Sequence, residues 1–170
     1  MKIAVNTRLL LKDRLEGIGW FTYENLRRIT TQHPEHQFYF FFDRKFHTDF
    51  IFSNNIQPIV IHPQARHPVL YYTWFEYSVP RMLKKIKADL FFSPDGYLSL
   101  KTDIPSMNVF HDLNFEHYPK DLPPIERYFY RKFFPEYAHK AIRIATVSEY
   151  SKKDIMNIYG VSKNKVDVVY

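Results

Sequence analysis

Residues 1–22, MKIAVNTRLLLKDRLEGIGWFT, contain the pattern that decides the fold. The short apolar segment from Lys2 to Asn6 predicts a buried strand. Gly17 and Gly19 come after this strand, and apolar residues then recur at helical spacing from Ile18 onward. A buried strand that passes through a glycine-bearing loop into a helix is typical of the first unit of a parallel α/β sheet.

The alternation of strand and helix continues along the chain. Further strands are predicted at 38–43, 57–61, 90–93, 109–111 with the residues just before it, 144–148 and 165–170. Helical spacing recurs around 128–133, and Pro80 is expected to kink or restart the helix of 74–86. Because crossover helices return the chain to the same end of a parallel sheet, we predict one doubly wound, Rossmann-like α/β domain over residues 1–170, with helices on both faces.

The composition excludes several kinds of chemistry. The 170 residues include no cysteine, so disulfides, thiolate metal sites and cysteine nucleophiles are ruled out. The N-terminus shows no secretory signal pattern and no apolar stretch approaches the length of a membrane span, so a cytoplasmic location is the default expectation. A net charge of +6 is compatible with attraction to phosphates, anionic lipid or nucleic acid and does not choose among them.

Aromatic residues make up 18% of the chain and gather in two stretches, Pro68 to Tyr77 and Phe115 to Tyr137. Two interpretations are open. The rings can simply pack in the core, or they can form a basic, aromatic surface that meets an acceptor, a lipid headgroup region or another domain.

Polar residues and glycines follow four of the predicted strands: Gly17 to Gly19, Ser93 to Gly96, His111-Asp112 and Ser148-Glu149. The carboxyl ends of parallel strands lie at one edge of an open sheet, which is where such sheets bind ligands. Gly17 and Gly19 are expected to allow positive φ and to bring backbone N–H groups to an anion. Two structural alternatives remain: His111 can bond a neighbouring carbonyl, and Asp112 can cap a turn or helix.

Other motifs are missing from the sequence. There is no GxxxxGK[ST] loop, and GxGxxG is not completed because Thr22 stands at its third glycine position, so nucleotide hydrolysis is disfavoured. HExxH and Asp-x-Asp are also absent, and His33 and His36 flank what is expected to be a surface turn. We therefore expect no metal and no cofactor. Ser148 and Gly160 are the expected N-cap and left-handed C-cap of the last helix.

Five segments, taken together, resemble a known family. They are Asn6 to Leu10, Gly17 to Thr22, Phe110 to Leu113, Ala145 to Ile155 and Tyr159 to Val161. Their order and spacing are similar to those of the N-terminal domain of the GT4 family of retaining glycosyltransferases. The resemblance implies the GT-B architecture, in which two Rossmann-like domains face a cleft and the second domain holds the nucleotide sugar. This chain corresponds to the first domain, and the C-terminal domain is expected to be absent from it.

The resemblance also implies roles for particular residues. The backbone N–H groups of Gly17, Ile18 and Gly19 would face the donor diphosphate, although Glu16 stands where many relatives have a small residue. His111 would be the catalytic-site contact to the donor sugar. The acceptor side or the cleft rim would be lined by Arg8, Asp95, Asp112, Ser148 and Glu149.

The function that follows from the resemblance is transfer of a sugar from a nucleotide-sugar donor to a hydroxyl of a glycan or a lipid-linked saccharide, with retention. The isolated chain is expected to be inactive, because the family's paired glutamates belong to the second domain. Peripheral contact with the inner face of the cell membrane is an expectation, and nucleic acid is not an expected partner. The alternative from another class is a non-catalytic, flavodoxin-like module that binds a glycan, a nucleotide or an anionic surface.

Overall fold

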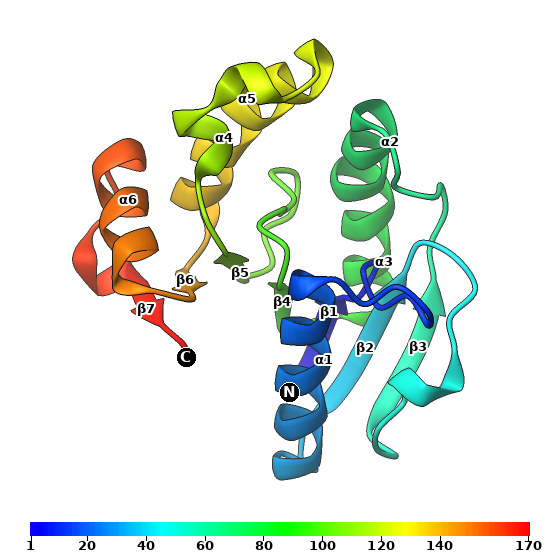
Figure 1. The fold of residues 1–170 in the computed structure, drawn as a ribbon. Coiled ribbons are helices and arrows are strands. Elements are labelled where there is room, and N and C mark those ends of the chain that lie inside the picture. Colours follow the sequence, from blue (N-terminus) through cyan, green and yellow to red (C-terminus); the bar gives the residue numbers. More distant parts are fainter.

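In the computed structural model, which describes residues 1–170, seven parallel strands lie side by side in the order β3-β2-β1-β4-β5-β6-β7 (Figure 1). The strands are β1 (Lys2–Asn6), β2 (Gln37–Phe42), β3 (Ile56–Val60), β4 (Leu90–Ser93), β5 (Ser106–Phe110), β6 (Arg143–Thr146) and β7 (Val166–Val168). All seven predicted strands are present, with ends shifted by a few residues. The doubly wound, Rossmann-like α/β prediction is confirmed.

Helices cover both faces of the sheet, as predicted. They are α1 (Gly17–Gln32), α2 (Pro68–Thr73), α3 (Val79–Ile86), α4 (Asn114–His117), α5 (Pro124–Lys140) and α6 (Glu149–Tyr159), with the π-helical segment η2 (Trp74–Ser78) and the 3₁₀ turns η1 (Thr48–Phe50), η3 (Pro119–Asp121) and η4 (Lys163–Lys165). Leu26 of α1 and Phe50 of η1 pack on one face, against Val5 and Phe40 of the sheet. The larger core lies on the other face, under α2, η2, α3, α5 and α6.

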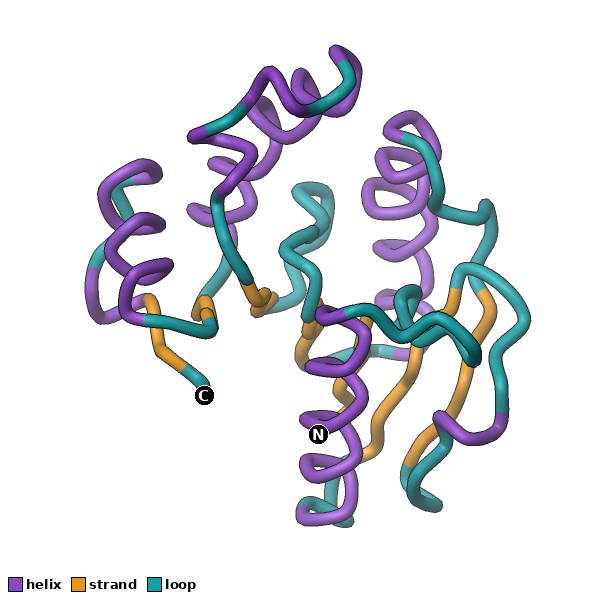
Figure 2. The backbone as a smooth tube through the Cα atoms, in the orientation of Figure 1, coloured by secondary structure: helices purple, strands orange, loops and turns teal.

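The direction in which the chain adds strands reverses at β1. The first crossovers place β2 and β3 on one side of β1, and the next places β4 on its other side. At such a switch point the loops leaving two neighbouring strands run in opposite directions and leave a crevice between them. Figure 2 shows the loops that follow β4 and β5 rising above the edge of the sheet, whereas the loop that follows β1 runs along this edge before it reaches α1.

Most of the aromatic residues lie in the larger core, so the core-packing interpretation holds for much of both stretches. Trp74 is fully buried and its indole N–H donates to the Ile61 carbonyl at 2.9 Å. Phe134 and Tyr137 of α5 are also buried in this core. Three tyrosines of these stretches are exceptions, because Tyr77, Tyr118 and Tyr128 are 50%, 65% and 63% exposed.

Pro80 restarts a helix, as expected. The α-helical ladder stops at Thr73, five residues adopt π-helical geometry, and α3 then begins with Pro80 in its first turn. The wider π turn belongs to the stretch that buries Glu76, whose carboxylate accepts the backbone N–H groups of Leu100 and Lys101 at 3.0–3.1 Å. Burial raises the pKa of Glu76, and these hydrogen bonds oppose the shift. Glu76 thereby anchors the loop between β4 and β5.

The predicted caps of the last helix are confirmed. The Ser148 hydroxyl accepts the Ser151 N–H at 3.0 Å, and Gly160 ends α6 with a φ of 66°. The prediction of positive φ at Gly17 and Gly19 is wrong, because α1 begins at Gly17 and both glycines belong to its first turn. Positive φ occurs instead at Gly96, where an added Cβ would also lie 3.1 Å from the Phe134 ring.

Candidate functional site

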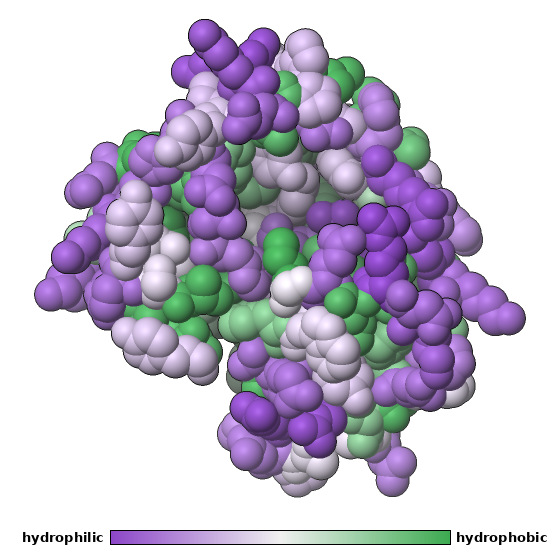
Figure 3. Space-filling model, viewed as in Figure 1, coloured by the Kyte–Doolittle hydropathy of each residue, from purple (hydrophilic) through white to green (hydrophobic).

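A cavity of about 640 Å³ opens at the carboxyl ends of β1, β4 and β5, beside the switch point. We call it the first cavity. The space-filling view shows a hollow in this part of the molecule, above α1 (Figure 3). Its walls combine aromatic rings with carboxylates, among them Asp95, Tyr97, Asp112, Phe115 and Tyr130. Rings with nearby hydrogen-bonding groups are the usual lining of a small-molecule site.

Arg8, just after β1, forms one wall of this cavity. Its side chain is 8% exposed and pairs with Asp95, with 2.7 Å between Nε and Oδ2. The guanidinium lies over the rings of Tyr97 and Tyr71, at 4.8 and 5.1 Å from their centroids. Burial alone lowers the pKa of Arg8, but the charge of Asp95 together with the surrounding tyrosines more than offsets this and the net pKa is raised, so Arg8 stays charged.

Asp95 is held in place by side chains from β1 and β4. Asn6 donates to its Oδ1 at 2.8 Å, and Ser93 donates to the same oxygen at 3.0 Å. The Asn6 amide also donates to the Ser93 hydroxyl at 3.0 Å. These bonds join the ends of the two strands on either side of the switch point, so they fix the shape of the crevice.

His111 directly follows β5 and lines the first cavity. Its Nε2 lies 2.8 Å from the Pro94 carbonyl, and its ring meets Phe21 of α1 edge-on at 4.9 Å. A carbonyl oxygen only accepts, so Nε2 carries the proton, and in the neutral ring Nδ1 is a free acceptor. The carbonyl-bonding alternative for His111 is therefore observed, and it leaves one ring nitrogen available to a ligand.

The remaining predicted acceptor residues divide into two groups. Asp112 lines the first cavity, and its carboxylate also accepts the Asn114 N–H at 2.9 Å, so it stabilises the turn that leads into α4. Ser148 and Glu149 line neither this cavity nor the one described next, because β6 lies one strand further from the switch point. Ser148 acts indirectly instead: it bonds Ser151, whose hydroxyl donates to the His111 carbonyl at 3.1 Å.

A second cavity, of about 650 Å³, adjoins the first and lies beside the N-terminus of α1. Arg8, Leu9, Ile18 and Tyr71 line both cavities. The second cavity is otherwise different, because Arg14, Arg44 and Arg66 line it and Glu16 is its one acidic residue.

The first turn of α1 lines the second cavity with Gly17, Ile18 and Gly19. No side chain caps this end of the helix and no acidic residue lies in its first turn, so these backbone N–H groups are available to an anion. An added Cβ at Gly17 would meet nothing within 4 Å, whereas one at Gly19 would lie 3.2 Å from the Leu9 carbonyl oxygen. The Glu16 carboxylate pairs with Arg14 at 3.0 Å and stays exposed.

Sequence reasoning missed two groups of lining residues. Tyr71 and Tyr130 come from helices α2 and α5, where an aromatic residue facing a cavity has the same spacing as one facing the core. Arg44 and Arg66 had a usable signal, because they follow β2 and β3 as the predicted residues follow β1, β4 and β5.

Three potential metal ligands come together at the opposite end of the sheet. His33, Glu35 and His36, between α1 and β2, bring one ligand atom each within 4.8 Å of one another, on a turn where His33 and Glu35 are exposed. They lie away from both cavities and take no part in the site described above.

The fold and these cavities define the class of protein: a doubly wound α/β domain with two adjoining cavities at its switch point. Solved structures with this fold include the lipopolysaccharide outer core galactosyltransferase WaaB (TM-score 0.59, 15% identity, 100% of this chain and 45% of that chain). Two others are the Anabaena protein HepE in complex with UDP and glucose (TM-score 0.58, 13% identity, 100% and 44%) and the Neisseria meningitidis UDP-GlcNAc 2-epimerase bound to UDP-GlcNAc (TM-score 0.59, 12% identity, 99% and 45%).

At these identities the likeness concerns the fold alone, and the present chain spans less than half the length of each of these proteins. No curated protein sequence matches the chain. The model of Glycosyltransferase Family 4 matches residues 16–170. The chain therefore belongs to glycosyltransferase family 4, and its fold is that of the GT-B glycosyltransferases, as the sequence motifs predicted.

Proposed function

We propose that this chain is the acceptor-side domain of a retaining glycosyltransferase that moves a sugar from a nucleotide-sugar donor to a hydroxyl of a glycan or lipid-linked saccharide. The observation that carries the proposal is the first cavity, where His111, Asp95 and Asp112 lie among tyrosine rings. Rings suit the flat apolar faces of sugars, and the carboxylates and Nδ1 of His111 can accept hydrogen bonds from sugar hydroxyls.

The donor would lie across the two cavities. The free N–H groups of Gly17, Ile18 and Gly19 would face its diphosphate, and His111 would accept a hydroxyl of its sugar near the reacting carbon. The paired glutamates that complete the family's site lie on a second domain, so this chain by itself would not catalyse transfer. Assaying the isolated chain with nucleotide sugars tests whether catalysis needs the second domain. Turnover at a rate typical of enzymes would refute this requirement.

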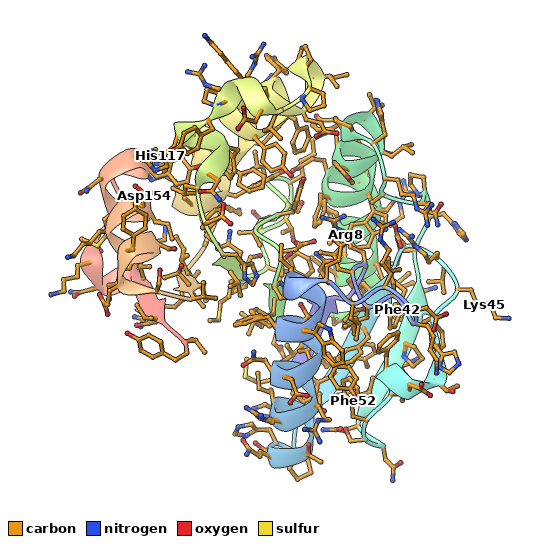
Figure 4. All side chains as sticks on the ribbon, in the orientation of Figure 1. Arg8, Phe42, Lys45, Phe52, His117 and Asp154 are labelled. Carbon is orange, nitrogen blue, oxygen red and sulfur yellow. The ribbon has the colours of Figure 1, made fainter.

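The decisive substitution is His111→Ala in a protein that joins this domain to its donor-binding partner domain. Loss of a hydrogen bond to the reacting sugar is expected to lower kcat by roughly a hundredfold. His117→Ala is the matched control, because His117 lies outside both cavities and pairs with Asp154 of α6 at 2.6 Å (Figure 4). A folded His111→Ala protein with wild-type kcat would remove His111 from the mechanism.

The alternative function, a non-catalytic module that binds a glycan, a nucleotide or an anionic surface, uses the same cavities without transfer. The presence of a UDP-GlcNAc 2-epimerase among the similar structures underlines that the fold alone does not decide the chemistry. Absence of transfer when the chain is joined to a donor-binding domain with its two glutamates intact would favour this alternative.

No helix has both the length and the apolar composition needed to cross a bilayer. Peripheral contact with the cell membrane remains part of the proposal, and the first turns of α5 support it, since Ile125 and Tyr128 are exposed there beside Arg131 and Lys132. Sedimentation with phosphatidylglycerol vesicles tests this contact. Arg131→Glu should reduce the bound fraction, and equal binding by the variant would contradict the contact.

A further inference from the structure

The second cavity has a charge that the proposed donor contact does not explain. Four arginines and one glutamate line it, which leaves three more positive than negative charges on its walls. The donor diphosphate is assigned to the glycines of α1, on one wall. Arg44 and Arg66 follow β2 and β3, on the side of β1 away from His111. The proposed donor contact therefore assigns no ligand to Arg44 and Arg66.

Carboxylates orient three of the four guanidinium groups without occupying all of their donors. Asp95 and Glu16 contact Arg8 and Arg14 through Nε, which leaves the terminal nitrogens of both arginines unpaired. Asp43, which is 1% exposed and also accepts the Ala65 N–H at 2.9 Å, holds Nε and one terminal nitrogen of Arg44, both at 2.6 Å.

Arg66 makes no ion pair and is exposed at the cavity edge. Arg8 is more than nine-tenths buried, and its terminal nitrogens have no partner in the protein. Figure 4 shows Arg8 between the start of α1 and α2. The second cavity is therefore lined by the buried guanidinium of Arg8 and the unpaired guanidinium of Arg66. The terminal nitrogens of Arg14 and one terminal nitrogen of Arg44 are also without a carboxylate partner.

The number of unpaired N–H donors in the second cavity indicates which kind of anion it would bind. A carboxylate has two oxygens and is satisfied by one guanidinium, whereas a phosphate ester presents three oxygens in different directions and suits several. We propose that the arginine wall of the second cavity, Arg8, Arg44 and Arg66, binds a phosphate group carried by the acceptor. This inference rests on the proposed function. Because the two cavities adjoin at Arg8 and Tyr71, such an acceptor would place its phosphate in the second and its reacting hydroxyl in the first.

The test is a titration of the ¹⁵N-labelled 170-residue chain with glycerol 3-phosphate at constant ionic strength, followed by NMR. Saturable shifts are expected for the backbone amide of Ala65 and the Nε–H groups of Arg44 and Arg66. Arg66→Ala should weaken the apparent affinity by about tenfold, the effect of losing one charge-assisted hydrogen bond.

Lys45→Ala is the matched control, because it removes the same charge from the same side of the molecule. Lys45 does not line the cavity and points outward into solvent (Figure 4). Unchanged affinity in Lys45→Ala with the loss in Arg66→Ala supports the site. Equal affinities in wild type and Arg66→Ala, or equal losses in both variants, would overturn it, because general electrostatic attraction would then explain the binding.

A second arm separates acceptor phosphate from donor diphosphate. UDP added to the chain saturated with glycerol 3-phosphate is expected to shift the amides of Gly17 to Gly19 and to leave the Arg66 signal in its bound position. Displacement of glycerol 3-phosphate by UDP would assign the arginine wall to the donor and overturn the inference.

A third arm separates a soluble from a lipid-linked phosphate, using phosphatidylcholine vesicles with and without phosphatidic acid. Binding to either phosphate source that depends on Arg66 supports the inference, and binding to neither overturns it. The titrations require no catalysis. Normal activity of His111→Ala would therefore refute the proposed role of His111 alone, and unchanged titration of Arg66→Ala would refute the phosphate site alone.

Discussion

The first cavity, at the ends of β1, β4 and β5, is walled by aromatic rings and carboxylates, whereas the second, toward β2 and β3, is walled by guanidinium groups. They have similar volumes, about 640 and 650 Å³, and they share Arg8. Size therefore does not distinguish them, and the side chains at the strand ends do. In the proposed function, the two sides of the switch point recognise different groups: hydroxyl groups on one side and anions on the other.

The largest effect is expected from removing the shared residue. Arg8→Met would leave Asp95 buried without its charge partner and should destabilise the domain by about 3–5 kcal/mol, measured by urea unfolding. Arg143→Met breaks the exposed pair with Asp167 and should cost about 1 kcal/mol or less. Similar losses in both variants would mean that the pair between the cavities is no more important than a surface pair.

The double variant Arg8→Met/Asp95→Asn sharpens this test, since it removes both charges. It should be more stable than Arg8→Met, because no unpaired carboxylate stays buried. Binding in both cavities should nevertheless remain weak, which separates the contribution of Arg8 to stability from its contribution to recognition.

A smaller effect is expected at the floor of the second cavity. Gly19→Ala would press a methyl group against the Leu9 carbonyl and Leu15, at 3.2 and 3.1 Å, and should lower the unfolding free energy by about 1–2 kcal/mol. Gly17→Ala meets open space and should change stability by no more than about 0.5 kcal/mol. The melting temperatures of the two variants, measured by thermal unfolding, test this difference. Equal values would contradict the close packing at Gly19.

The smallest effect should be confined to the first cavity. Tyr118 lines it and is 65% exposed, so Tyr118→Ala removes a ring at its mouth with little loss of stability. Affinity for a saccharide acceptor should fall about fivefold, roughly 1 kcal/mol, while phosphate binding stays unchanged. Tyr128→Ala is the control, because Tyr128 is similarly exposed (63%) and lines neither cavity. A loss of phosphate binding in Tyr118→Ala would contradict the assignment of Tyr118 to the first cavity alone.

The sequence predicted the parts of this arrangement that depend on strand order. Arg8, Asp95 and His111 follow β1, β4 and β5, and parallel pairing brings such positions together whatever the details of packing. Ser148 was expected beside them on the same grounds. It follows β6, and distance from the switch point is set by strand order in space, which the spacing of strands in the sequence does not reveal.

Tyr97 and Tyr130 show a second limit. Their hydroxyl groups lie 3.0 Å apart at the cavity wall, yet in the sequence both belong to segments whose other rings pack in the core. The helical pattern specifies which side of α5 faces inward, and both the core and the cavity lie on that side. The start of α1 is a third case, because glycine is unfavourable within a helix and the pattern predicted a loop where the helix already begins.

The position of Arg8 has a thermodynamic consequence. Arg8 lines both cavities, so two small ligands bound at once, one in each cavity, would compete for its N–H donors. Their affinities are then coupled, and linkage requires each ligand to weaken the other by the same factor. A single molecule that reaches into both cavities avoids this antagonism, and its second group binds at a high effective concentration once the first is seated. The shared arginine thus favours one bridging ligand over two separate fragments.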